Sequence, residues 1–104
     1  MDLITLTPRV SVDLSLRLRS PGQVLLHDYL VPQALNNAQL ARRTGIPVKH
    51  IKEFILGDRP MSANHAIRLA AVLGTTEFYW LALQAHYDLV REWQKHRATL
   101  PLVG

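Results

Sequence analysis

The 104-residue sequence has no cysteine, which excludes disulfide bonds and thiolate metal sites. It also has no apolar run of the ~20 residues that a transmembrane helix needs, so no membrane partner is expected. The first residues lack the basic start and long apolar stretch of a signal peptide. Internal repeats and low-complexity segments are absent as well. These absences favour a cytoplasmic globular protein.

The composition supports one folded domain with a basic surface. Hydrophobic residues make up 48% of the chain, enough for a single core at this length. The formal net charge is +4 and the pI is about 10.0, which suits a polyanionic partner. The charge is concentrated between residues 36 and 60. The basic residues there are Arg42, Arg43, Lys49, Lys52 and Arg59, against the acidic Glu53 and Asp58.

Residues 36–57 predict two short helices joined by a tight turn. Asn36 suits an N-cap, because its side-chain oxygen can accept from a free amide of the first turn. Gly45 suits a left-handed residue at the end of the first helix, and Pro47 suits the start of the second. On a helical wheel of the second helix, one face is apolar and anchors it; its members are Val48, Ile51 and Ile55. The opposite face is outward, with His50 at its margin; its members are Lys49, Lys52, Glu53 and Leu56.

This arrangement is typical of the helix-turn-helix that enters the DNA major groove. The alternative is an ordinary helix-glycine-helix corner, which any helical bundle contains. The flanking chain therefore decides between the two interpretations.

The N-terminal segment differs from the rest of the chain. Apolar residues alternate with polar ones from Val10 to Arg19, which predicts a strand with one apolar face. We expect residues 1–19 to form a β arm that pairs with a second copy, lies on the helical body or meets a partner protein, since one strand is not stable alone. The other interpretation is a loosely ordered arm.

The remaining chain, residues 20–97, predicts a helix-turn-helix and dimerisation domain. Ser20 and Pro21 begin a helix that Pro32 ends. Ser62 caps another helix, which Gly74 ends, and Thr75 or Thr76 caps a last long helix from Glu77 to about residue 96. The buried stripe expected for the helix after Ser62 consists of Ala66, Ile67, Ala70 and Leu73. Residues 98–104 are expected to form an irregular tail.

The last helix carries two apolar stripes, although a helix at the edge of a small domain needs only one. The first stripe consists of Phe78, Leu81, Ala85 and Leu89. The second consists of Trp80, Leu83, Tyr87 and Val90, and we expect it to form a homodimer interface with its aromatic residues as anchors. The alternative is that the domain covers this stripe with its own tail.

Several motifs resemble the HigA-type antitoxins, VapI-like members of the XRE helix-turn-helix class. They occur in order and in register between Ser20 and Leu89. The matching segments are Ser20-Pro21-Gly22-Gln23-Val24-Leu25, Tyr29-Leu30-Val31-Pro32, Gln39-Leu40-Ala41-Arg42, Gly45-Ile46-Pro47, Ala66-Ile67-Arg68-Leu69-Ala70 and Trp80-Leu81-Ala82-Leu83-Gln84-Ala85-His86-Tyr87-Asp88-Leu89. The sequence departs from the family where Asn36-Asn37 replaces Ser-Gln and where Ala82 replaces an asparagine. The β arm is not part of the family pattern.

The resemblance implies an all-α, five-helix, λ-repressor-like domain that represses its own operon as a homodimer and neutralises a HigB-type ribonuclease toxin. The toxin follows from the resemblance alone. A two-fold dimer implies a palindromic operator on double-stranded DNA.

For contacts with DNA, the expected residues divide by chemistry. Lys49, Lys52 and His50 are candidates for phosphates or base edges, and Glu53 for a cytosine amino group. Val48 borders the same face. Gln39 corresponds to a glutamine that bonds to DNA in much of the class. The phosphate candidates are Arg42, Arg43 and Arg59.

Other functions are disfavoured or remain open. An enzyme is disfavoured, because no catalytic spacing occurs. A metal site is disfavoured, because His50 and Glu53 share a helix but lack the further ligands that zinc needs; no cofactor is expected. An orphan XRE repressor without a toxin, or a protein-interaction module that no longer binds DNA, remains open.

Overall fold

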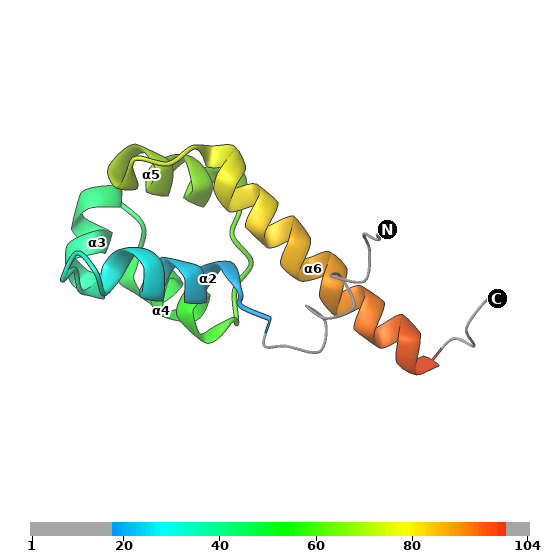
Figure 1. Ribbon diagram of the computed structural model, residues 1–104. Helices are drawn as coiled ribbons and strands as arrows, with labels where there is room; N and C mark the ends of the chain where they lie inside the picture. Colours follow the sequence, from blue (N-terminus) through cyan, green and yellow to red (C-terminus); the bar gives the residue numbers. More distant parts are fainter. Residues whose placement is uncertain (1–17, 100–104) are drawn as a thin grey trace.

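The computed structural model describes residues 18–99, which form a helical domain (Figure 1). Its elements are α2 (Pro21–Val24), the π-helix η1 (Leu25–Leu30), α3 (Asn37–Thr44), α4 (Val48–Leu56), α5 (Ala63–Leu73) and α6 (Glu77–Thr99). No strand occurs within these residues. The predicted β arm lies outside the described residues except for Leu18 and Arg19, which are not in a strand.

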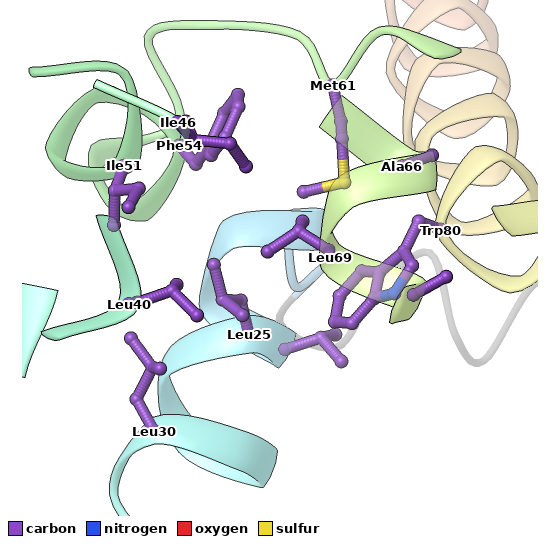
Figure 2. Packing of buried hydrophobic residues seen from close by; sticks show 12 residues of the cluster. Leu25, Leu30, Leu40, Ile46, Ile51, Phe54, Met61, Ala66, Leu69 and Trp80 are labelled. Carbon is purple, nitrogen blue, oxygen red and sulfur yellow. The ribbon is translucent and has the colours of Figure 1, made fainter. Parts of the chain in front are cut away.

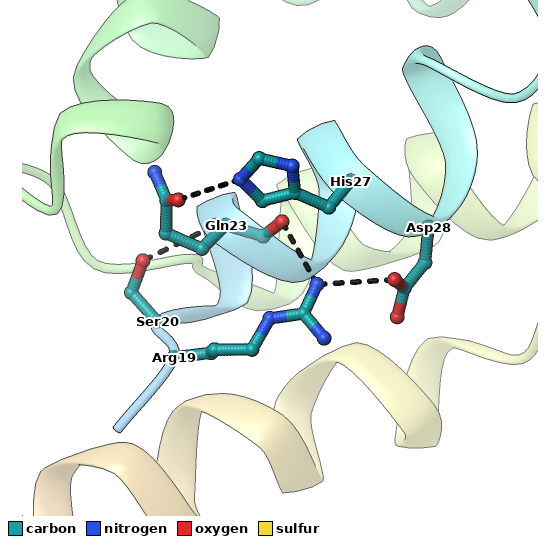
Figure 3. A network of polar contacts seen from close by, with 5 residues as sticks. All are labelled: Arg19, Ser20, Gln23, His27 and Asp28. Atoms are coloured by element: carbon teal, nitrogen blue, oxygen red, sulfur yellow. Dashed lines mark hydrogen bonds and ion pairs between the residues drawn. The ribbon is translucent and has the colours of Figure 1, made fainter. Parts of the chain in front are cut away.

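The first helix begins as predicted and then widens. The Ser20 Oγ accepts a hydrogen bond from the Gln23 N–H at 3.2 Å. Around this cap, Arg19 donates to the Gln23 carbonyl and to Asp28, and His27 Nε2 donates to the Gln23 side chain (Figure 3). From Leu25 onward the helix is a π-helix, a form that closes i to i+5 hydrogen bonds. The sequence predicted an ordinary helix here.

Because residue 22 is glycine, the backbone of α2 can lie directly against the backbone of α4. A Cβ added to Gly22 would lie 1.7 Å from the Phe54 carbonyl oxygen and 2.6 Å from the Ile55 nitrogen. The Gln23 side chain also donates to the Ile55 carbonyl. The helix that precedes the helix-turn-helix is therefore in direct contact with the C-terminal half of α4.

The core lies between α2, η1, α3, α4, α5 and the start of α6 (Figure 2). Its largest fully buried side chains are Trp80, Phe54, Leu25, Leu30, Leu40, Ile46, Ile51 and Leu69. In α5 the buried residues are Ala66, Leu69 and Ala70, whereas Ile67 is 56% exposed. The prediction that Ile67 belongs to the buried stripe was wrong, because it lies a quarter turn away from the line through Ala66, Leu69 and Ala70.

The two stripes of α6 are not divided between core and surface in the way the sequence predicted. Trp80 is fully buried and Val90 is 3% exposed within a single chain. Trp80 also donates from Nε1 to Thr75 Oγ1 at 2.7 Å, and Thr76 Oγ1 caps the helix by accepting from the Tyr79 N–H. Trp80, which was expected to anchor a dimer interface, therefore lies in the protein's own core.

The other members of these stripes divide less cleanly, because Leu81 of the first stripe also packs against the core. Leu83 packs against the core and Tyr87 is partly buried, whereas Phe78 and Leu89 are 75% and 49% exposed. On the wheel Trp93 lies beside Leu89, and it is 41% exposed. The helix extends to Thr99, slightly beyond its expected end. No helix within residues 18–99 combines the length and hydropathy of a membrane span.

Candidate nucleic-acid interface

The turn between α3 and α4 is fixed by its own residues. Gly45 has φ of 77°, the left-handed conformation that glycine adopts without strain. The Thr44 hydroxyl donates to the Leu40 carbonyl at 2.8 Å and accepts from the Ile46 N–H at 3.1 Å. Ile46 is buried at 2% exposure and anchors the turn in the core. These contacts hold α4 at a set angle to α3.

Helix α5 also stabilises this turn through Arg68. Arg68 Nη1 donates to the Thr44 carbonyl at 3.1 Å, and its Nε donates to Asn64 at 2.9 Å. An arginine at a helix C-terminus is favoured by the negative end of the helix dipole. This role of Arg68 is not evident from the sequence, because the contact joins residues far apart in the chain.

At the start of α3, Gln39 takes part in a capping box that the sequence did not predict, and its predicted contact with DNA stays a prediction. Asn36 Oδ1 accepts from the Gln39 N–H at 2.8 Å, and Gln39 Oε1 accepts from the Asn36 N–H at 2.9 Å. This reciprocal capping box occupies the oxygen of Gln39 and leaves its NH₂ group as a donor. Asn37, the first residue of α3, carries a second side-chain amide there. Asn36-Asn37 stands where the family has Ser-Gln, and this match in position was the signal that could have identified Asn37 as a candidate DNA contact.

Of the residues predicted to anchor α4, Ile51 is buried and Val48 and Ile55 are partly buried. The outward face is exposed as predicted at Lys49, Lys52 and Leu56, and Glu53 is partly exposed. Ile51 and Phe54 are buried beneath it at 0% and 1% exposure. Lys49 and Lys52 are exposed and have no hydrogen-bond or ion-pair partner among residues 18–99. Val48 is partly buried beside them. Arg42 and Arg43, on α3, are likewise exposed and unpartnered within the described residues.

Glu53 and Arg59 are engaged with each other. Arg59 Nε lies 2.6 Å from Glu53 Oε1, in a partly exposed ion pair that crosses the turn at Gly57. The hydrogen bond from Arg59 holds the pKa of Glu53 below its usual value. One oxygen of the Glu53 carboxylate is therefore engaged by Arg59, while the predicted contacts of Glu53 with a cytosine amino group and of Arg59 with a phosphate stay predictions.

His50 turns toward α5. Its Nδ1 lies 3.3 Å from His65 Nε2, and the two rings meet edge-on. His65 also packs edge-on against Phe54, with ring centroids 4.7 Å apart. Within residues 18–99 no group of three or more potential metal ligands occurs. The described part of the predicted site thus combines free cations, an ion pair and a histidine pair around one exposed helix.

Comparisons with known proteins place this arrangement in a family. No family model matches the chain. An uncharacterized helix-turn-helix transcriptional regulator of Escherichia coli K12 is 37% identical over 70 residues, which are 67% of this chain and 62% of that regulator's length. The chain thus spans less than two thirds of that relative. Antitoxin HigA-1 of Vibrio cholerae is 34% identical over 70 residues, covering 67% of this chain and 66% of the antitoxin.

The fold comparison agrees with the sequence comparison. The Pseudomonas aeruginosa antitoxin HigA, solved with the higBA promoter, superimposes with a TM-score of 0.75 at 26% identity. The match covers 84% of this chain and 100% of that structure. The capped α3, the glycine turn and the anchored α4 are therefore elements of a known architecture, and the chain belongs to the HigA-type antitoxin family of helix-turn-helix proteins.

Proposed function

We propose that the protein is a DNA-binding antitoxin that represses its own operon as a homodimer and neutralises a HigB-type toxin. The observation that carries the DNA-binding part is the outward face of α4. It offers Lys49 and Lys52 without partners in the described chain, on a helix anchored by Ile51 and Phe54. The P. aeruginosa relative with this fold was solved with its promoter.

The side chains around α4 divide between positioning and reading. Lys49, Lys52, Arg42 and Arg43 are unpaired within the described residues and suit phosphates, which fix the register of a protein on DNA. Base reading falls to Val48 and His50 in the first turn of α4 and to amide donors at the start of α3. Those donors are the NH₂ groups of Asn37 and Gln39.

The dimer interface is proposed on the exposed stripe of α6. Phe78, Leu89 and Trp93 are large, apolar and exposed, and they follow one line along the helix. Ala82 and Ala85 lie between them and allow close approach of a second helix. Large exposed apolar surface of this kind marks an interaction site. A second copy that presents the same stripe would bury both and set two α4 helices side by side on a palindromic site.

Binding to DNA is tested by a salt series on a duplex from the region upstream of the gene, with a scrambled duplex for comparison. The variant Lys49→Ala/Lys52→Ala removes the α4 cations. The matched control is Lys95→Ala, which removes the same charge type from the far end of α6 (Figure 1). We expect the double variant to lower the slope of log K against log salt by about 1 per lost phosphate contact.

The outcomes separate the candidate functions. Salt-dependent preference for the upstream duplex, lost in the double variant and kept in the control, supports a repressor. Equal binding to both duplexes by the wild type identifies α4 as something other than a reader and favours a protein-interaction module.

The toxin is tested separately, by co-expressing the protein with a short basic reading frame beside its gene. Relief of growth arrest supports the antitoxin, while repression without such a neighbour favours an orphan repressor. Deleting residues 1–19 in the same assay tests whether the predicted arm contributes to neutralisation.

A further inference from the structure

In the histidine pair between α4 and α5, the donor and the acceptor of the hydrogen bond can be assigned. The backbone N–H of Ser62 donates to His65 Nδ1 at 3.2 Å, and the Ser62 hydroxyl lies 2.8 Å from the same nitrogen. A backbone amide is a donor only. His65 Nδ1 is therefore an acceptor, and the proton of the neutral His65 ring is on Nε2.

The hydrogen bond between His65 and His50 then determines which ring nitrogen of His50, on α4, carries the proton. His65 Nε2 lies 3.3 Å from His50 Nδ1, so the Nε2–H of His65 donates and His50 Nδ1 accepts. In a neutral imidazole one nitrogen donates and the other accepts. The proton of His50 is then on its own Nε2, which has no partner within residues 18–99.

Two surroundings keep the His65 ring neutral and in place. Burial lowers the pKa of His65, and the nearby His50, Arg59 and Arg68 lower it further. The ring is also held edge-on by Phe54 at 4.7 Å and by the capping box at the start of α5, where Ser62 Oγ accepts from the His65 N–H. Protonation at Nδ1 would set an N–H against the Ser62 amide and break this cap.

We propose that His65 is a positioning residue that sets His50 as a neutral Nε2–H donor on the margin of α4, where it bonds to an acceptor of the DNA. The proposal rests on the DNA-binding function above. The acceptor is an oxygen or nitrogen of a base edge or a phosphate oxygen. Ser62, His65 and His50 together form a relay that begins at a backbone amide and ends at the reading helix.

The relay itself is tested without DNA, by ¹⁵N NMR of the histidine rings at pH 7.5. We expect both His50 and His65 to show an unprotonated Nδ1 and a protonated Nε2, and the exposed His86, whose ring has no partner within residues 18–99, serves as the reference. In His65→Gln, Gln keeps the capping box but ends the relay. His50 should then move toward the values of His86. A wild-type His50 that already matches His86, or that carries its proton on Nδ1, would overturn the proposal.

The role in binding is tested with His50→Ala, His65→Gln and the control His86→Ala on the upstream duplex. Loss of the donor should weaken binding on the order of tenfold in His50→Ala and less in His65→Gln, with no change in His86→Ala. A base acceptor would relax preference at one base pair, whereas a phosphate acceptor would weaken all sequences equally. Unchanged affinity in His50→Ala would remove His50 from the DNA contact. Absence of DNA binding by the wild type would refute the proposed function, while the ring nitrogens would still decide the relay.

Discussion

Replacing Gly22 by alanine has two opposing effects on the free energy of unfolding. Gly22 lies in the first turn of α2, where alanine normally stabilises a helix by up to about 1 kcal/mol. The added Cβ, however, would lie 1.7 Å from the Phe54 carbonyl oxygen and 2.1 Å from its carbon. Both atoms belong to the backbone of α4, so no side-chain rotation relieves the overlap.

The net effect follows from comparing the two magnitudes. Helix α2 must move about 1 Å or more from α4, and it carries the buried Val24 and leads directly into Leu25. Overpacking of this severity costs about 3 kcal/mol, at the upper end of the usual range. After the helical gain, the loss is about 2 kcal/mol. For a domain of this size the melting temperature should fall by roughly 8–16 °C.

The assay is thermal and urea unfolding of wild type and Gly22→Ala at one fixed protein concentration, because self-association shifts apparent stability. Gly74→Ala is the control. Its Cβ would meet nothing within 4 Å, so only the left-handed φ of 73° is penalised. A Gly22→Ala protein as stable as the wild type, or more stable, would refute the backbone contact between α2 and α4.

Three further outcomes are expected. Trp80→Phe should cost about 2 kcal/mol in urea unfolding, because it leaves a void and an unpaired Thr75 hydroxyl; a cost near zero would contradict its place in the core. Trp93→Asp should weaken self-association at least about tenfold by sedimentation, and an unchanged dimer would exclude the exposed stripe. Arg59 lowers the pKa of Glu53 in the folded chain. The ion pair therefore adds to the free energy of unfolding above the ordinary glutamate pKa, and this contribution is lost as pH falls through the pKa of Glu53 in the folded chain. Wild type should therefore lose more stability than Glu53→Gln between pH 7 and pH 3, and parallel losses would argue against the ion pair.

The local signals in the sequence predicted most of the helix boundaries. Asn36 and Ser62 cap helices, and Gly45, Gly57 and Gly74 end them with positive φ, as their residue types favour. Each of these features depends on a few adjacent residues. The outward face of α4 was also predictable, because the positions of Ile51, Lys49 and Lys52 on the wheel depend only on helical spacing.

Features that join distant residues were not predictable in the same way. Periodicity shows that α6 has two apolar stripes but not which of them meets the body; Trp80 is inward because Thr75 and the core surround it. The Glu53–Arg59 pair crosses a turn, and His50 and His65 are 15 residues apart. Such contacts require the relative placement of helices, which spacing along one chain does not specify.

The contacts from α5 to the helix-turn-helix have a mechanical consequence. Arg68 of α5 forms a hydrogen bond with the end of α3, and His65 of α5 forms one with the first turn of α4. We therefore expect α5 to move together with the helix-turn-helix of α3 and α4, here called the reading unit. In a dimer joined through α6, the internal geometry of each reading unit would then stay constant. A partner that altered the crossing angle of two α6 helices would change the separation and the relative orientation of the two units on the DNA, so that fit to the operator would depend on the spacing and the helical phase of the half-sites.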